Sequence, residues 1–320
     1  MAMKSKLKIF HASDVHGSEK CFRKFLNVPK VYGVDVIIMG GDITGKMLVP
    51  IVEQGDGSYK TEYMGSELVL KSQDEVEKIT KLIADAGGYP YICTVDEYDK
   101  LKNDPAYLDR IFKNQIVKRV EEWVNLAEER LKSSGVEVYI MPGNDDYPEI
   151  DEALNKSEFV INPDGKLVVI GGRYEMISTG YVNITPWKAP RDIPDEKLEE
   201  ILEELATQLK RPGDSIFSLH APPYNTPIDL APLLDNTLKP VLASGELVMT
   251  HVGSIAVRKL IEKYQPLLGF HGHIHESKGM VKIGRTICLN AGSDYLAGNL
   301  QGAIVTLEDG KVKSYMFTIG

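Results

Sequence analysis

The sequence predicts an α/β fold, and two observations support this prediction. The segment from Leu7 to Met39 contains an apolar run, a stretch with helical spacing and a second apolar run. This order is typical of a βαβ unit, whose two strands lie parallel. In addition, successive apolar runs along the chain end in glycine, acidic residues or histidine. We therefore expect these side chains to gather at the carboxyl ends of the strands.

Each core element is predicted from its own pattern. Strands are assigned to short apolar runs bounded by glycine, proline or polar residues, and helices to apolar residues at three- and four-residue spacing. In chain order the predicted core elements are a strand over residues 7–12, a helix over 19–31, strands over 34–39 and 137–142, paired strands over 167–172 and 174–179, a helix over 194–209, a strand over 215–219, a helix over 254–264, a strand over 267–270, and antiparallel strands over 283–289, 303–307 and 312–317.

The composition changes between the second and third core strands. Here the patterns predict a hairpin around Gly55-Asp56-Gly57, an amphipathic helix over residues 73–86, a short strand over 89–93 and a long helix over 107–131. We interpret residues 46–106 as a cap-like insertion, since its apolar content is too small for a core of its own. Residues 1–320 would then form a single domain.

Composition excludes several classes of function. The chain has 37 Lys and Arg residues against 46 Asp and Glu residues, a formal net charge of −9. A broad basic surface is therefore absent, so long nucleic acid is an improbable partner, whereas a small phosphorylated ligand is compatible. Cys21, Cys93 and Cys288 are odd in number and widely spaced, which fits a reducing compartment and predicts a cytoplasmic location. We expect no targeting segment or membrane anchor, and the oligomeric state stays unknown.

Side chains able to bind metal follow five of the predicted strands. The residues are Asp14, His16, Asp42, Asn144, His220, His273 and His275. Carboxylates, imidazoles and one amide oxygen, without cysteine, form the ligand set of a divalent Mn, Fe, Zn or Co site. A His-x-His pair can serve two neighbouring metals, and an Asp between them can bridge both. His251 is a rival to His220 as a ligand, but His220 is the one delivered by an apolar run.

These residues lie in motifs that resemble those of a known family. The series Asp14-Val15-His16, Gly41-Asp42, Gly143-Asn144-Asp145-Asp146, His220 and Gly272-His273-Ile274-His275 resembles the five ordered motifs of the calcineurin-like metallophosphoesterases. The resemblance implies a four-layer α/β/β/α sandwich of two mixed sheets with a dinuclear metal site at the strand ends. Residues 181–194 and 251–258 also resemble a less characterised, mainly prokaryotic branch of that superfamily.

The resemblance also implies an activity and a distribution of ligands. Asp14, His16 and His275 would hold one metal, Asn144, His220 and His273 the other, and Asp42 would bridge them. The two divalent ions, with Mn²⁺ favoured in vitro, would direct an in-line attack by a bridging hydroxide on a small phosphomonoester or phosphodiester. A catalytically weak protein that binds metal and a phosphorylated ligand on the same fold is the alternative function.

The third motif departs from the usual Gly-Asn-His, since Asp145 replaces the histidine. Asp145 could be the general acid, it could be structural with His251 or His11 replacing the lost imidazole, or the metals alone could serve a good leaving group. We favour the third interpretation and then the first. Among possible substrate contacts we select Asn144 and Arg258. Arg258 lies near the start of a predicted helix, where free backbone N–H groups favour an anion.

One motif suggests a different class of enzyme. Residues 40–47, read as Gly-Gly-Asp-Ile-Thr-Gly-Lys-Met, nearly match the phosphate loop of NTPases and kinases and follow a strand. Met47 replaces the hydroxyl residue that should reach Mg²⁺, and Asp42 would place a negative charge among the phosphates. We therefore reject the NTPase interpretation.

Overall fold

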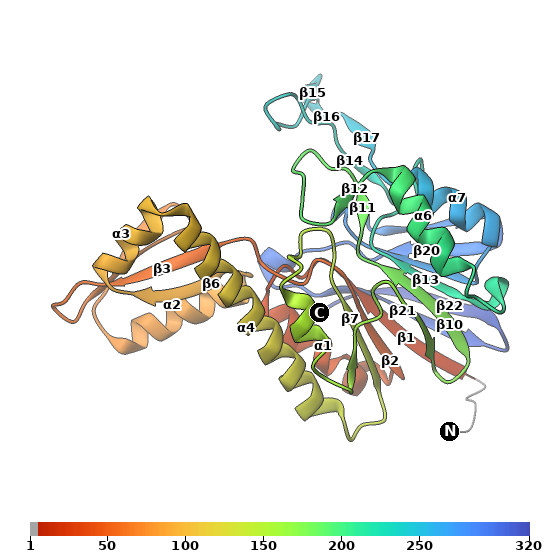
Figure 1. The fold of residues 1–320 in the computed structure, drawn as a ribbon, viewed down its shortest axis with the longest axis horizontal. Coiled ribbons are helices and arrows are strands. Elements are labelled where there is room, and N and C mark those ends of the chain that lie inside the picture. The colour runs from red at the N-terminus through yellow and green to blue at the C-terminus, as the bar shows by residue number, and fades with distance from the viewer. Residues whose placement is uncertain (1–5) are drawn as a thin grey trace.

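Two six-stranded mixed sheets lie at the centre of the computed structural model, which describes residues 6–320 (Figure 1). The first sheet has the order β22 (Lys311–Ile319), β21 (Gln301–Glu308), β1 (Lys6–Ala12), β2 (Val36–Gly40), β7 (Glu137–Met141) and β8 (Val160–Ile161). The second has the order β19 (Gly279–Ile283), β20 (Thr286–Asn290), β18 (Leu268–His271), β13 (Ile216–Leu219), β10 (Tyr174–Thr179) and β9 (Leu167–Ile170).

Four neighbouring strands of each sheet run parallel. β1, β2, β7 and β8 run parallel, as do β10, β13, β18 and β20. The antiparallel neighbours are β21 and β22 in the first sheet and β9 and β19 in the second. The carboxyl ends of the parallel strands therefore share one edge of each sheet, which is where the sequence predicts the site.

Helices cover the outer face of both sheets and complete the four-layer α/β/β/α sandwich that was predicted (Figure 1). Side chains of α1 (Glu19–Tyr32) and α4 (Pro105–Leu131) pack on the first sheet, and those of α6 (Asp195–Ala206) and α7 (Ile255–Tyr264) pack on the second. Along β1, Phe10 joins the helix-side core while Ile9 joins the core between the sheets. The alternation follows because successive side chains of a strand point to opposite faces.

One predicted strand is wrong in its limits. The sequence pattern predicts a single strand over residues 283–289, but a turn at Gly284-Arg285 separates β19 from β20. Gly284 has a φ of 58°, in the left-handed region that glycine adopts without a steric penalty. β19 and β20 then pair with each other in antiparallel fashion.

The insertion forms a separate lobe, at the left of Figure 1. Its sheet has the order β5 (Ser66–Leu70), β4 (Tyr59–Tyr63), β3 (Leu48–Glu53) and β6 (Tyr89–Cys93), and its helices are α2 (Gln73–Asp85) and α3 (Val95–Asn103). The hairpin of β3 and β4 was predicted, whereas β5 and α3 were not. The lobe buries a cluster of its own, made of Val49, Ile51, Tyr63, Leu70, Val76, Ile79 and Ile83. The apolar content is thus larger than we inferred from composition.

The remaining elements are short. They are α5 (Ile150–Leu154), β11 (Val182–Asn183), β12 (Asp192–Ile193), β14 (Leu230–Pro232), β15 (Leu242–Ala243), β16 (Glu246–Leu247), β17 (Met249–His251) and the 3-10 turns η1 (Pro212–Asp214) and η2 (Tyr295–Ala297). In Figure 1, β15 and β16 form a protruding hairpin above the second sheet. Within residues 6–320, no helix is both long and apolar enough to cross a membrane.

Candidate metal centre

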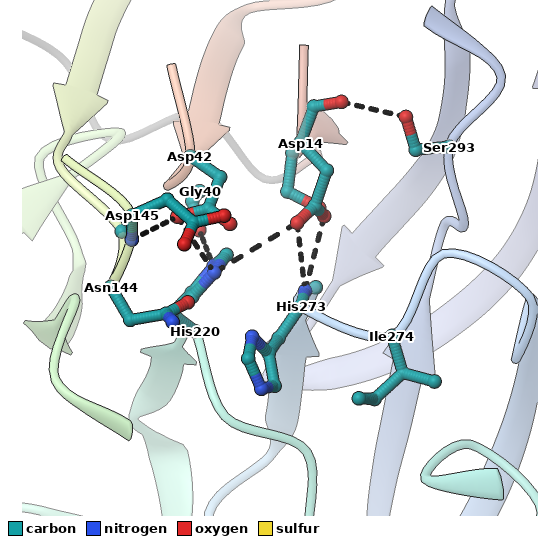
Figure 2. A network of polar contacts seen from close by, with 12 residues as sticks. Asp14, Gly40, Asp42, Asn144, Asp145, His220, His273, Ile274 and Ser293 are labelled. Carbon is teal, nitrogen blue, oxygen red and sulfur yellow. Dashed lines mark hydrogen bonds and ion pairs between the residues drawn. The ribbon is translucent and has the colours of Figure 1, made fainter. Parts of the chain in front are cut away.

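All seven predicted ligands lie together at the carboxyl ends of the central strands. Figure 2 shows several of them at neighbouring strand ends of the two sheets. Asp14 and His16 follow β1, Asp42 follows β2, Asn144 follows β7, His220 follows β13, and His273 and His275 follow β18. Side-chain atoms form two sets, Asp14 with His16 and His275, and Asp42 with His220 and His273, and within each set they lie within 4.8 Å of one another.

Asp42 lies between the two sets. Its Oδ1 is 3.3 Å from His220 Nε2, and its Oδ2 is 3.8 Å from His16 Nε2. In the first set, His16 Nε2 lies 3.0 Å from His275 Nε2, so the two rings direct these nitrogens toward the same place. Burial alone would raise the pKa of Asp42, but the His220 and His16 rings hold it well below its usual range. An ionised carboxylate with one oxygen toward each set is suited to bridge two cations.

The loops that carry the ligands have unusual backbone conformations. The φ angles are 57° at Asp14, 39° at His16, 50° at Asp42 and 67° at His273, a region that residues with a side chain rarely adopt. Two hydrogen bonds, from Asp14 N to Gly41 O and from His16 N to Asp42 O, both 2.9 Å, join the loops after β1 and β2. Such strained residues concentrate at functional sites, where the surrounding structure holds them in place.

Glycines allow these loops to approach one another. A Cβ atom on Gly143 would lie 2.2 Å from Asp42 N, and one on Gly272 would lie 2.3 Å from Ser13 Oγ. A Cβ atom on Gly41 would lie 2.5 Å from His220 Nδ1. All three distances are too short for a real carbon atom, so the glycines of the motifs are required by close packing around the ligands.

Two predicted ligands are oriented by a hydrogen bond on their far side. His220 Nδ1 lies 2.9 Å from Gly40 O and donates to it, since a carbonyl oxygen only accepts. In the neutral ring, the form that binds metal, His220 Nε2 then carries the lone pair. Asn144 Nδ2 donates to Asp192 Oδ1 over 3.0 Å. Within residues 6–320, the buried atoms His220 Nε2 and Asn144 Oδ1 have no hydrogen-bond partner. Two buried acceptors without partners, among carboxylates and imidazoles, fit a divalent metal site.

The two acidic residues of the third motif have different environments. Asp146 is fully buried, and its carboxylate accepts from the backbone N of Gly143 at 2.7 Å, of Ile43 at 3.0 Å and of Thr44 at 2.8 Å. It fastens the loop after β7 to the loop after β2. Asp145 is partly exposed; its backbone N donates to Asp42 Oδ1 over 3.0 Å.

The Asp145 carboxylate forms an ion pair with Lys46 Nζ. Burial, followed by the charge of Asp42, raises the pKa of Asp145 to about 7, although Lys46 opposes this shift. Because this carboxyl group lies beside the predicted ligands and holds a proton more strongly than an exposed one does, it is placed to exchange a proton with a bound molecule.

The described contacts of His251 and Arg258 are with residues other than the predicted ligands. The His251 ring lies on β17, with Nδ1 2.7 Å from Asp229 Oδ1. Arg258 Nη1 donates to the carbonyl oxygens of Tyr224 and Asn225, each over 2.9 Å, and its Nε donates to Glu262. The catalytic role for His251 and the substrate contact for Arg258 therefore stay predictions that these contacts do not support.

Two alternatives from the sequence are wrong. His11 cannot replace the missing imidazole, because its ring is buried between the sheets and stacks on Phe270 with 4.6 Å between the ring centres. Residues 40–47 do not form the phosphate loop of an NTPase. Such a loop must open a helix, whereas the chain continues directly into β3.

Sequence reasoning missed several residues at the site. Tyr295 packs its ring against His16, with 4.8 Å between the ring centres, and at 6.1 Å from His275. Asp192 orients Asn144, and Lys46 pairs with Asp145. No local pattern marks Tyr295 or Asp192. Lys46 had a signal, since it is the lysine of the rejected phosphate-loop motif.

Comparison with known proteins agrees with this geometry. The family profile described as calcineurin-like phosphoesterase matches residues 7–277. The chain belongs to this family. Proteins of this family are, in general terms, metal-dependent phosphoester hydrolases, and the ligand sets described above are candidates for the divalent metals that the family binds.

Individual relatives support the same fold. The uncharacterized protein MJ1162 of Methanocaldococcus jannaschii is 33% identical over 195 residues, which cover 60% of this chain and 79% of MJ1162. The crystal structure of TT1561 of Thermus thermophilus is similar with a TM-score of 0.51 and 16% identity, over 98% of both chains. Another crystal structure has a TM-score of 0.55 and 16% identity, also over 98% of both chains.

Proposed function

We propose that this protein hydrolyses a small phosphomonoester or phosphodiester with the help of two divalent metal ions, and that Mn²⁺ supports this activity in vitro. Asp14, His16 and His275 would hold one ion, Asn144, His220 and His273 the other, and Asp42 would bridge them. The observation that carries the proposal is the position of Asp42, whose two oxygens face His220 and His16 of the two sets. A pair of divalent ions supplies Lewis acidity and an activated water for in-line displacement at phosphorus.

The residues of the chain have separate tasks in this proposal. Asp42 and Asp14 provide negative charge for the metals. Gly40 O holds the His220 ring, and Asp192 holds the Asn144 amide, so that His220 Nε2 and Asn144 Oδ1 face the metal site. The Tyr295 ring packs against the His16 ring and keeps it in place. A good leaving group would need no proton from the protein, whereas a poor one would take it from Asp145. A cytoplasmic location is part of the proposal, since the three cysteines are buried and unpaired.

The test starts from metal-free protein. We would add Mn²⁺, Fe²⁺, Zn²⁺ or Mg²⁺ and measure hydrolysis of p-nitrophenyl phosphate and bis(p-nitrophenyl) phosphate, with Asp42→Asn as the control. We expect the wild type to hydrolyse at least one ester with Mn²⁺. The Asp42→Asn variant should lose both this turnover and the binding of the two metals. Tight metal binding without turnover of any ester would favour the alternative, a protein that binds metal and a phosphorylated ligand.

A further inference from the structure

Lys46 is a cation held at the mouth of the candidate metal centre. It lies in the loop between β2 and β3, and its Nζ forms an ion pair with the Asp145 carboxylate. An oxygen of the same carboxylate lies within 4.8 Å of ligand atoms on His16 and on Asp42. The ammonium group therefore lies near His16 and Asp42, two of the predicted ligands, without being a ligand itself, because an ammonium group has no lone pair.

The backbone below Lys46 is fixed, although its side chain is 58% exposed. Gly45 N donates to the Tyr89 hydroxyl over 2.9 Å. A Cβ atom on Gly45 would lie 1.8 Å from Gly87 O, so the loop presses directly against the insertion. This anchoring distinguishes Lys46 from a lysine on an open surface, since the root of its side chain has little freedom. Together with the ion pair to Asp145, this anchoring places the ammonium group at the mouth of the site.

Lys46 shares the mouth of the site with acidic side chains. The charged groups that face it are Asp145 and Asp42, and the Tyr295 ring lies close by. Arg191, by contrast, is buried, and its guanidinium donates to Asp146 O and to Asp151. A phosphate at the metals would approach the Asp145 carboxylate and be repelled by it. Lys46 offsets that repulsion and adds a donor with a full positive charge.

We propose that Lys46 is a substrate-binding residue that donates to a phosphoryl oxygen, with Asp145 as the residue that positions it. This inference rests on the proposed function and specifies it. A point charge at the mouth favours a dianionic phosphate over a monoanionic one, so Lys46 selects phosphomonoesters over phosphodiesters. The lysine of the rejected phosphate-loop motif would thus bind phosphate after all, from a loop that leads into a strand.

The experiment measures binding of inorganic phosphate to the Mn²⁺-loaded full chain by calorimetry. We expect Lys46→Gln to weaken phosphate binding about tenfold and Lys46→Arg to restore part of the loss, since one charged hydrogen bond is removed. Lys46→Met repeats the measurement should the Gln variant fail to fold. The matched control is Lys81→Gln, which removes another exposed lysine paired with an aspartate, Asp85 on α2, and should stay within about twofold of the wild type.

Kinetics give a second readout. With p-nitrophenyl phosphate, Lys46→Gln should raise KM about tenfold with a smaller change in kcat, whereas KM for bis(p-nitrophenyl) phosphate should change less than about threefold. Mn²⁺ affinity should be unchanged in every variant. Wild-type phosphate affinity in Lys46→Gln, or no phosphate binding by the Mn²⁺-loaded wild type, would overturn the inference. If phosphate binding depends on Lys46 but no ester is hydrolysed, the inference holds and the proposed hydrolase function fails.

Discussion

Asp145 stands where the third motif usually carries histidine, and its role depends on the leaving group. Its backbone N–H is bound to Asp42, which places the carboxyl group beside the predicted ligands. Since general acid catalysis contributes most where the leaving group is poor, we expect Asp145→Asn to lower kcat for an alkyl phosphate about 100-fold. The kcat for p-nitrophenyl phosphate should change less than about threefold. Equal rates of both enzymes on the alkyl ester would remove Asp145 from the mechanism.

Asn144 takes its orientation from a residue far along the chain. Asp192 Oδ1 accepts from the Asn144 amide nitrogen at 3.0 Å, which turns the amide oxygen toward the predicted metals. In Asp192→Asn the new amide can pair with either end of Asn144, so this orientation is lost. We expect Mn²⁺ affinity at one of the two sites to fall about 10- to 100-fold. A calorimetric titration measures both sites, with Asp214→Asn as a surface control; two unchanged sites would contradict the prediction.

The positions of the predicted ligands at strand ends could be predicted from the sequence, but their hydrogen-bond partners could not. Asp14, Asp42 and His220 each follow a short apolar run, so their position at a strand end can be inferred from neighbouring residues alone. The contact of Asn144 with Asp192, by contrast, joins residues 48 positions apart. Contacts of this kind depend on how loops cross in the folded chain, which no local pattern records.

Strand β1 carries a buried histidine that links stability to pH. His11 is 1% exposed, and burial lowers its pKa to about 3 from an ordinary value of 6.5. Between these values the unfolded chain binds a proton at His11 that the folded chain does not bind. The stabilising effect of the neutral ring is therefore complete above pH 6.5 and is lost as the pH falls toward 3, by about 1.4 kcal/mol for each pH unit.

A single variant isolates this effect. His11→Leu removes the titrating group and keeps an apolar side chain in the position that stacks on Phe270. Urea unfolding of both proteins at pH 7, 6 and 5 gives the free energy of unfolding, and other acid effects, including loss of metal, cancel in the comparison. The free energy should fall more steeply with decreasing pH in the wild type. Parallel curves for the two proteins would show that His11 is protonated as readily in the folded state as in the unfolded state.

Helices and strands could be predicted where the apolar residues of a segment follow one regular spacing. The βαβ unit at the N-terminus and the helices on both outer faces follow from apolar spacing, which depends on short-range geometry. The insertion was harder to predict because its buried residues are spread over three strands and a helix, so no segment of it is strongly apolar. Its core arises only when these elements pack together.

In the whole molecule, one helix joins the insertion to the sandwich. The N-terminal part of α4 packs Tyr107 and Ile111 in the insertion, and its later turns pack Ile116 and Trp123 under the first sheet. At the base of the insertion, Ser18 Oγ donates to Asp85 O over 2.6 Å. The continuous helix and this hydrogen bond at the base of the insertion favour the single domain that we predicted, in which the insertion unfolds together with the sandwich.

The three cysteines can test this prediction, because each lies in a different core. Cys21 lies under the first sheet, Cys288 under the second and Cys93 in the insertion. Burial raises the pKa of Cys93 to about 11 and that of Cys288 to about 12, so each thiol reacts only when its core opens. Each bound metal ion at 100 times its Kd stabilises the folded state by about 2.7 kcal/mol, which lowers the population of the globally open state about 100-fold.

Alkylation followed by mass spectrometry, in dilute urea with Mn²⁺ or with a chelator, measures the three cysteines separately. Every predicted ligand lies in the sandwich, so direct stabilisation by metal cannot reach Cys93 except through coupling between the two cores. If the chain is one cooperative unit, Mn²⁺ should slow labelling of all three thiols by a similar factor. Protection of Cys21 and Cys288 with no change at Cys93 would instead mean that the insertion opens independently, as a second domain supported by its own buried cluster.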